Sequence, residues 1–213
     1  MNNKTHKMEI FRNAGLYLVT SSELSNYPTP EVIEKYLKAG GKLFQLREKT
    51  MQENQFYETG LAAKRLSDTY GAVFIINDNV EMAKRLNADG VHLGQDDMSV
   101  VEARKILGGD FIIGVSTHNT EEAVQAQKDG ADYINIGPVF PTATKPHMQT
   151  LGITGVEKIL PSVDIPFTFM GGIKESNIHL LKKLHPAALA MVTEITKSPD
   201  VFSKVKSLLQ AAF

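Results

Sequence analysis

Two short apolar segments, LFQLR at residues 43–47 and VFII at residues 73–76, flank a longer stretch over residues 53–70. The long stretch carries apolar residues at helical spacing and ends at Gly71. The short segments lack the apolar–polar alternation of a strand with one wet face. Strands that are apolar on both faces are typical of parallel sheets covered by helices. This region therefore predicts a strand–helix–strand unit with the two strands parallel.

The same alternation continues outward from this unit in both directions. It predicts eight strands, at residues 16–20, 43–47, 73–76, 90–93, 111–115, 133–136, 167–170 and 189–192. It predicts eight helices, at residues 30–39, 53–70, 81–86, 100–107, 120–128, 155–160, 176–184 and 199–211. For the first of these helices, Thr29 is a candidate N-cap because Pro30 suits the first helical position.

Eight strand–helix units in 213 residues match a (β/α)8 TIM barrel, and a doubly wound open sheet is the alternative. No linker, low-complexity tract or charge block divides the chain, so we expect one domain. We place the barrel at residues 15–213 and expect residues 1–14 to form a loose N-terminal extension.

Composition restricts the possible functions. The chain has 23 basic and 24 acidic residues, so no overall field favours nucleic acid or a membrane surface. It has no cysteine, which excludes disulfides, thiolate metal sites and cysteine nucleophiles. No apolar run approaches the roughly 18 residues of a membrane span, and the first eight residues lack a signal-peptide core. We expect a soluble, cytoplasmic protein that acts on small molecules, and a homo-oligomer stays open.

Cationic and hydroxyl side chains follow two of the predicted strands. Gln45, Arg47 and Lys49 alternate along the second strand, so they lie on one side of it and suit a cluster of anionic oxygens. A long connection, residues 140–153, follows the sixth strand and carries the motif TATK at 142–145. Long loops in compact domains are often functional, so we expect this motif to contact an anion.

Carboxylates follow the next two strands. Asn77 and Asp78 end the third strand, and Asp97 follows the fourth. Each of these residues is also a good helix cap, which is the competing explanation. The carboxyl ends of all barrel strands share one face, where active sites form, so the two carboxylates can meet. Mg²⁺ prefers one or two carboxylates together with waters and phosphate oxygens, so this pair predicts a magnesium site.

The remaining strand ends predict a second anion site. Gly171 and Gly172 follow the seventh strand, and Val192 and Thr193 end the eighth. Barrels often hold phosphate in these two loops, and glycine lets backbone N–H groups approach a ligand closely. The fifth strand ends in Ser116 and His118, and His92 lies within the fourth strand. Such histidines are more often structural than catalytic.

Several motifs together resemble the thiamine-phosphate synthase family. They are QLREK at 45–49, ND at 77–78, DGVHLGQ at 89–95, GPVF at 137–140 with TATK at 142–145, and GGI at 171–173. Their order and approximate spacing are also similar, and the resemblance covers the chain from Gly15 onward. It implies a (β/α)8 transferase that joins a pyrimidine diphosphate to a thiazole phosphate with Mg²⁺ as cofactor.

The resemblance also implies residue roles. Asp78 and Asp97 would bind Mg²⁺, and Arg47, Lys49 and Lys145 would act on the leaving diphosphate. The pyrimidine diphosphate would contact residues at the ends of strands two to six, namely Gln45, Leu46, Arg47, Glu48, Lys49, Asn77, Ser116 and Lys145. The thiazole phosphate would contact residues after strands six to eight, namely Thr142, Ala143, Thr144, Gly172, Val192 and Thr193.

The chain departs from the family pattern before the eighth strand. Members usually have Gly-Ala-Asp-Gly there and end the strand with Ser, whereas this chain has His185 to Ala188 and Thr193. We expect Pro186 to reshape the approach to the thiazole-phosphate pocket. Two other functions stay open: a thiazole tautomerase that uses His118 as acid and base, and a thiamine-phosphate sensor without turnover.

Overall fold

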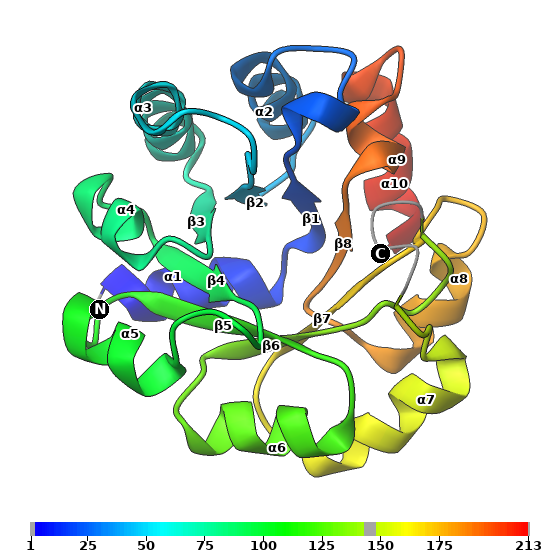
Figure 1. The fold of residues 1–213 in the computed structure, drawn as a ribbon. Coiled ribbons are helices and arrows are strands. Elements are labelled where there is room, and N and C mark those ends of the chain that lie inside the picture. Colours follow the sequence, from blue (N-terminus) through cyan, green and yellow to red (C-terminus); the bar gives the residue numbers. More distant parts are fainter. Residues whose placement is uncertain (1–2, 143–147, 213) are drawn as a thin grey trace.

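Eight parallel strands close into a barrel in the computed structural model, which describes residues 3–142 and 148–212 (Figure 1). Each strand pairs with the next along the chain, and the eighth pairs with the first. The strands are β1 (Gly15–Val19), β2 (Leu43–Leu46), β3 (Val73–Asn77), β4 (Gly90–Leu93), β5 (Ile112–Thr117), β6 (Tyr133–Ile136), β7 (Phe167–Met170) and β8 (Ala188–Met191). The TIM barrel predicted from the sequence is confirmed, and the open sheet is excluded.

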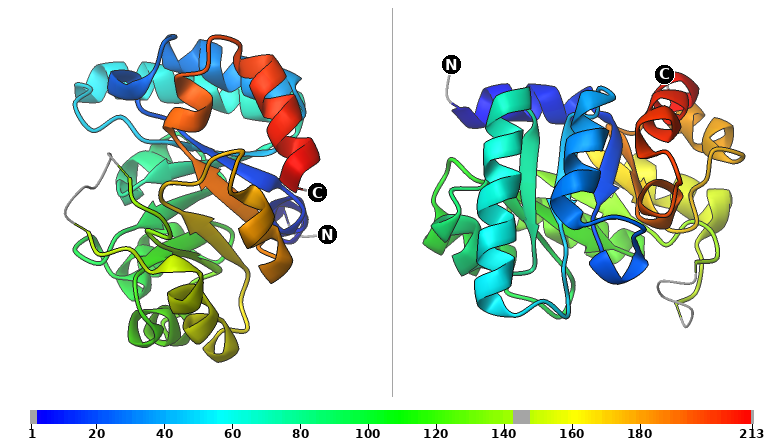
Figure 2. Two further views of the ribbon diagram at one scale, coloured as in Figure 1. Left: turned by 90° about the vertical axis from the view of Figure 1, so that its right-hand side faces the viewer. Right: turned by 90° about the horizontal axis from the view of Figure 1, so that it is seen from above.

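Helices surround the barrel on its outer side (Figures 1 and 2). In the described residues they are α1 (Asn3–Arg12), α2 (Thr29–Lys38), α3 (Glu53–Tyr70), α4 (Val80–Arg85), α5 (Val100–Leu107), α6 (Thr120–Lys128), α7 (Gly152–Ile159), α8 (Ile178–Leu181), α9 (Thr193–Thr196) and α10 (Val201–Ala212). Short 3-10 turns are η1 (Ser22–Leu24), η2 (Leu160–Ser162) and η3 (Lys182–Leu184). Across residues 3–142 and 148–212, none of these helices combines the length and apolarity that crossing a membrane requires.

Alternation along each strand divides its side chains between two cores. On β2, Phe44 and Leu46 point outward and pack against the helices, whereas Leu43 and Gln45 point into the barrel. Because the whole strand is buried, both sets must be mostly apolar, which explains the continuous apolar runs in the sequence. The polar exceptions are inward positions toward the carboxyl ends of β2 to β6, and they line the site described below.

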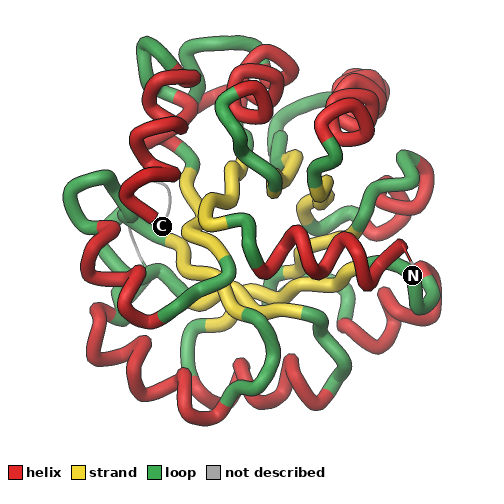
Figure 3. The backbone as a smooth tube through the Cα atoms, turned by 180° about the vertical axis from the view of Figure 1, so that it is seen from behind, coloured by secondary structure: helices red, strands yellow, loops and turns green. Residues whose placement is uncertain are grey.

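The N-terminal segment is a helix packed on the barrel, so the prediction of a loose extension is wrong for residues 3–12. Helix α1 crosses the end of the barrel where the strands begin (Figure 3). Its Phe11 is fully buried and its ring lies 4.4 Å from that of Tyr133, centroid to centroid. Lys7 forms an ion pair with Asp89 and Lys4 forms one with Asp132. The helix therefore closes the amino-terminal end of the barrel.

Replacing Phe11 by Ala is expected to destabilise the protein by about 3–5 kcal/mol, because it removes a fully buried ring and leaves a cavity under the barrel. Phe202→Ala is the matched control, since the Phe202 side chain on α10 is 39% exposed and its loss should cost far less. Chemical denaturation of both variants measures the difference. Equal stabilities would mean that α1 does not support the barrel.

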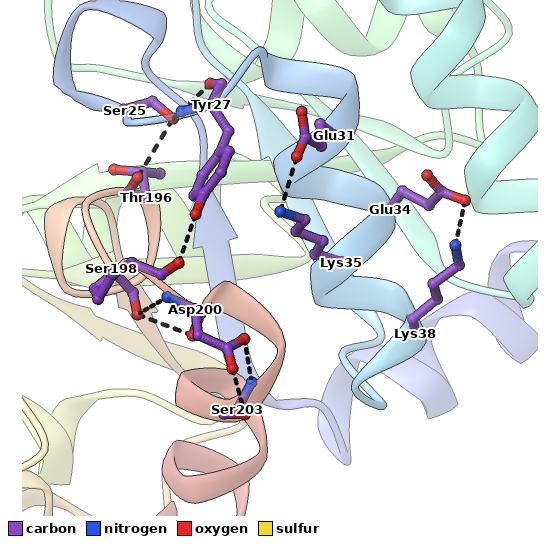
Figure 4. A network of polar contacts seen from close by, with 11 residues as sticks. Ser25, Tyr27, Glu31, Glu34, Lys35, Lys38, Thr196, Ser198, Asp200 and Ser203 are labelled. Atoms are coloured by element: carbon purple, nitrogen blue, oxygen red, sulfur yellow. Dashed lines mark hydrogen bonds and ion pairs between the residues drawn. The ribbon is translucent and has the colours of Figure 1, made fainter.

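The first and eighth units are joined by polar contacts around the loop that follows β1 (Figure 4). The Ser25 hydroxyl donates to the Tyr27 carbonyl, and the Tyr27 hydroxyl donates to the Pro199 carbonyl at 2.5 Å. The Asn26 N–H donates to the Thr196 carbonyl. These contacts hold the loop after β1 against the segment after β8, on the same face of the barrel as the candidate site.

The predicted N-cap of α2 is wrong by one residue. Pro28 is the N-cap, and Thr29 is already helical. The Thr29 hydroxyl donates instead to the Glu48 carboxylate at 2.7 Å, a contact between residues 19 apart in the sequence. A tertiary partner has thus replaced the local capping bond that the sequence suggested.

Candidate active site

A central cavity opens at the carboxyl ends of the strands. Every strand of the barrel, or the loop directly after it, contributes to its wall. The residues that line it are Val19, Gln45, Arg47, Asn77, His92, Ser116, His118, Asn135, Gly137, Pro138, Thr142, Met148, Met170, Gly171 and Val192. Most of these inward side chains are polar, although the strands that carry them are apolar. This is the face on which barrel enzymes build their active sites.

The structure brings together several residues that the sequence singled out. Gln45, Arg47, Asn77, Ser116 and Thr142 all line the central cavity, although they come from strands or loops up to 97 positions apart. Gln45 is buried, and its amide nitrogen donates to the Tyr17 hydroxyl at 2.7 Å. The shared carboxyl-terminal face of the barrel makes this convergence possible.

Two neighbours of these residues do not contribute side chains to the cavity. Leu46 points outward into the core between β2 and the helices, because adjacent residues of a strand face opposite sides. Glu48 is buried, and its carboxylate accepts hydrogen bonds from the Ser22 N–H and the Thr29 hydroxyl, both at 2.7 Å. The Leu46 side chain therefore does not face the cavity, and the Glu48 carboxylate holds the loop after β1. Contact of these two residues with substrate stays a prediction.

An acidic recess adjoins the central cavity beside β3. Its lining includes Lys49, Asn77 and Asp78, and Asn77 also lines the central cavity. Asp78 has a φ of 59°, a left-handed conformation that Asp and Asn tolerate better than other side chains, and its N–H donates to the His92 carbonyl of β4. The Asp97 carboxylate accepts from the Gly94 N–H at 2.7 Å. These backbone contacts place the two carboxyl groups next to each other.

Helix capping does not explain these carboxylates. The Asn79 side chain caps α4 by accepting from the Met82 N–H, and Ser99 with Glu102 forms a capping box on α5. Both helices are therefore capped by other residues, and the competing explanation for Asp78 and Asp97 is excluded.

Asp97 lies close enough to Asp78 to perturb the ionisation of its carboxyl group. Burial and, next, the neighbouring Asp97 carboxyl together raise the pKa of Asp78 to about 6, while Lys49 and Asn77 oppose the shift. Two carboxylates held side by side repel each other unless a proton or a cation lies between them. The donor set, Asp78 in the acidic recess and the neighbouring Asp97, fits Mg²⁺ because that ion uses one or two carboxylates and fills its other positions with water and phosphate oxygens.

A glycine recess adjoins the central cavity on the opposite side, after β7 and β8. It is lined by Pro141, Thr142, Gly171, Gly172, Val192 and Thr193, among others. Gly171 and Gly172 have φ of 101° and 61°, and a Cβ on either would collide with residues 138–141. The Phe140 N–H donates to the Gly171 carbonyl at 3.0 Å. The glycines thus allow the loop after β6 to lie directly against the end of β7.

Pro186 lies at the other end of the barrel from this recess. It precedes β8, and the neighbouring Ala187 accepts from the Gly15 N–H and donates to the Phe167 carbonyl, at the starts of β1 and β7. The expectation that Pro186 reshapes the approach to the phosphate pocket is therefore wrong. The departing segment lies where the strands begin, whereas Val192 and Thr193 line the recess where β8 ends.

Some cavity residues were not singled out from the sequence. Asn135 is buried inside β6 and accepts from the Thr168 hydroxyl at 2.9 Å, and Tyr17 and Tyr133 lie beneath the cavity floor. An amide inside the four-residue run YINI was the available clue for Asn135. His118, which the sequence did single out, lines the cavity too, and its Nδ1 lies 2.8 Å from the Glu122 carboxylate. Ala143, Thr144 and Lys145 lie outside the described residues.

A closed parallel barrel whose polar side chains converge at the carboxyl ends defines the class of (β/α)8-barrel enzymes. A family model described as thiamine monophosphate synthase matches residues 16–195. The chain belongs to this family, which confirms the resemblance found in the sequence motifs.

Individual relatives agree over nearly the whole chain. A thiamine-phosphate synthase of Caldicellulosiruptor saccharolyticus is 42% identical over 208 residues, which cover 96% of this chain and 94% of the relative. One of Dictyoglomus turgidum is 39% identical over 210 residues, 97% of this chain and 94% of the relative. The structure of a thiamine phosphate pyrophosphorylase from Pyrococcus furiosus is 32% identical, has a TM-score of 0.86, and covers 94% of this chain and 96% of its own.

Proposed function

We propose that the protein is a thiamine-phosphate synthase. It would join 4-amino-2-methyl-5-(diphosphomethyl)pyrimidine to 4-methyl-5-(2-phosphoethyl)thiazole, as such or in carboxylated form, and release diphosphate. The observation that carries the proposal is the position of the central cavity between an acidic recess and a glycine recess. One substrate with a diphosphate and one with a monophosphate require two different anion sites around one reaction centre.

The pyrimidine diphosphate is assigned to the central cavity and the acidic recess. Arg47 and Lys49 would supply positive charge to the diphosphate, with Lys145 as a further cation in the prediction from sequence. Gln45, Asn77 and Ser116 would hold the rest of this substrate. Asp78 and Asp97 would hold Mg²⁺, which supplies Lewis-acid stabilisation of the leaving oxygens when bound.

The reaction is a displacement at the exocyclic carbon of the pyrimidine. The bond from this carbon to the diphosphate oxygen breaks, and the bonding pair leaves with the diphosphate. The aminopyrimidine ring stabilises the positive charge that develops on the carbon, and the thiazole nitrogen supplies its lone pair to the new carbon–nitrogen bond. Because that nitrogen carries no proton, no general base is needed. The chain has to align the two rings, exclude water and stabilise the departing charge.

The thiazole phosphate is assigned to the glycine recess, with Thr142, Gly172, Val192 and Thr193 around the phosphate. Ala143 and Thr144 complete this set in the prediction from sequence. Placing the phosphate after β7 and β8 is common in barrels of this class. The thiazole ring then extends from the recess into the central cavity, where the two recesses meet.

The test is an assay of diphosphate release with both substrates, with Mg²⁺ and with EDTA. Chelation is expected to lower the rate by about a thousandfold, because a bound Mg²⁺ contributes several kcal/mol and about 1.4 kcal/mol is tenfold in rate. Restoring excess Mg²⁺ should restore the rate. A rate that is the same with EDTA would remove the metal from the proposal.

The same assay separates the other functions. Conversion of the thiazole phosphate without any pyrimidine diphosphate would indicate a tautomerase that uses the His118–Glu122 pair. Binding of thiamine phosphate without turnover of the two substrates would indicate a sensor. We further propose that the protein acts in the cytoplasm, and self-association into a homo-oligomer stays a prediction.

A further inference from the structure

Five side chains form a continuous series of hydrogen bonds across the inside of the barrel, which we call the cross-barrel chain. The Gln45 amide nitrogen donates to the Tyr17 hydroxyl at 2.7 Å, and the Tyr17 and Tyr133 hydroxyls lie 3.0 Å apart. The Tyr133 hydroxyl lies 2.9 Å from His92 Nδ1, and His92 Nε2 lies 2.9 Å from the Ser116 hydroxyl. The chain thus begins and ends with residues that line the central cavity.

The two tyrosines are fully enclosed in the middle of this chain. Burial raises the pKa of both hydroxyls, so each keeps its single proton near neutral pH. The Tyr133 ring packs against Phe11 on one side, and a Cβ on Gly114 would lie 2.0 Å from its Cζ atom. The Tyr133 ring is therefore held in one orientation, and each of the two hydroxyls has one proton to donate.

The direction of the hydrogen bonds follows from counting these protons. The amide nitrogen of Gln45 can only donate, so the Tyr17 oxygen accepts from it. The Tyr17 hydroxyl then donates its hydrogen bond to the Tyr133 hydroxyl, its other partner in the cross-barrel chain. The Tyr133 hydroxyl in turn donates its hydrogen bond to His92 Nδ1. A neutral imidazole that accepts at Nδ1 carries its own proton on Nε2. His92 Nε2 therefore donates to Ser116, and the hydroxyl proton of Ser116 stays available to the cavity.

We propose that Tyr17 and Tyr133 are positioning residues that orient both ends of the cross-barrel chain. At one end Ser116 offers a hydrogen-bond donor to the substrate, and at the other Gln45 offers its amide oxygen as an acceptor. This arrangement suits a ligand that presents an acceptor and an N–H donor together, as an aminopyrimidine with its diphosphate does. The inference about this ligand rests on the proposed function, whereas the inference about proton order does not.

The proton order can be measured without any substrate. In ¹⁵N-histidine-labelled protein, the His92 ring is expected to show its proton on Nε2, with the signal assigned by its loss in His92→Asn. In Tyr133→Phe the donor to Nδ1 is gone, and His92 is expected to shift toward the other tautomer or a mixture. A proton on Nδ1 of His92 in the wild-type protein would overturn the proposal and leave the proposed reaction intact.

The kinetic consequence can be measured with a double-mutant cycle. Tyr133→Phe and Ser116→Ala are each expected to lower kcat/KM for the pyrimidine diphosphate by about tenfold, the effect of one hydrogen bond to a charged group. The double variant should be no slower than Ser116→Ala, because both changes remove the same interaction. The KM for the thiazole phosphate should stay unchanged. Effects that multiply in the double variant would overturn the proposal.

Tyr36→Phe is the matched control for loss of a buried hydroxyl. The Tyr36 hydroxyl is fully buried and donates to the Leu16 and Leu43 carbonyls, outside the cross-barrel chain. The kcat/KM of Tyr36→Phe for the pyrimidine diphosphate should stay within twofold of the wild-type value. If Tyr133→Phe fails to fold, two measurements still test the cross-barrel chain: the kinetics of Tyr17→Phe, and the tautomer of His92 in the wild-type protein. Tyr133→Phe kinetics equal to those of Tyr36→Phe would count against it.

Discussion

Asp78→Asn is expected to lower turnover by about a thousandfold while it raises the stability of the protein. The activity falls because Asn removes one of two carboxylates that would hold Mg²⁺ at the leaving diphosphate, a contribution of several kcal/mol. Asn is the suitable replacement because Asp78 has a φ of 59°, which Asn tolerates and Ala does not. A loss of activity in this variant therefore reports on the charge and not on backbone strain.

The stability gain follows from the pKa of Asp78. Burial and Asp97 raise this pKa to about 6 from its ordinary value of 3.8, so the fold favours the protonated carboxyl. The protonated Asp78 carboxyl contributes its full share to the free energy of unfolding below pH 3.8. This contribution is lost as the pH rises through about 6 and the group ionises. At pH 7 the ionised group therefore destabilises the metal-free protein. Asn resembles the protonated form and should restore about 1 kcal/mol after allowance for partial exposure, or roughly 2–4 °C in Tm.

Asp96→Asn is the matched control for this experiment. Asp96 is exposed, and the same substitution there should change neither turnover nor Tm appreciably. Both variants should be compared by thermal unfolding in EDTA and by diphosphate release in Mg²⁺. An Asp78→Asn protein with wild-type turnover would show that Asp78 does not serve a metal.

Gly172→Ala is expected to lower kcat/KM for the thiazole phosphate by about a hundredfold. The new Cβ would lie 2.4 Å from the Pro141 carbonyl oxygen and 2.8 Å from the Phe140 Cβ, and the φ of 61° strains any L side chain. The loop after β6 must move, and Thr142 moves with it. Displacing a substrate-positioning group by about 1 Å can cost this much in rate. The KM for the pyrimidine diphosphate should change much less.

Gly71→Ala separates backbone strain from loop displacement. Gly71 has a φ of 57° at the end of α3, and a Cβ there would meet no atom within 4 Å. It should cost about 1–2 kcal/mol of stability and leave the kinetics unchanged. Steady-state kinetics with each substrate varied in turn would distinguish the two variants. Equal kinetics in Gly172→Ala and Gly71→Ala would remove the glycine recess from substrate binding.

The barrel could be predicted because its pattern is local. An apolar run such as VFII must be buried on both faces, and eight such runs alternating with helices leave few other architectures. The convergence of Gln45, Arg47, Asn77 and Ser116 could also be predicted, since every parallel strand delivers its carboxyl end to the same face. For the same reason the pairing of Asp78 with Asp97 followed from adjacent strands.

What the sequence did not predict depends on partners far along the chain. Glu48 lines the acidic recess, but the sequence did not predict that its carboxylate also accepts hydrogen bonds from the Ser22 N–H and the Thr29 hydroxyl. The same contact explains why Thr29 does not cap α2. The helix of residues 3–12 was missed because its sequence is polar apart from a few residues, and only its position over the barrel buries Phe11. No local pattern contains this information.

Helix α1 closes the amino-terminal end of the barrel, and only the Tyr133 ring separates its Phe11 from the residues that line the central cavity. Phe11 touches Tyr133, and Tyr133 belongs to the cross-barrel chain, which continues through His92 to Ser116. In most barrels the amino-terminal end can be redesigned with little effect on the reaction, since the two ends are separated by several layers of packing. In the proposed arrangement that freedom would be reduced, because an altered shape at position 11 would change the packing of the Tyr133 ring and with it the hydrogen bonds that lead to Ser116.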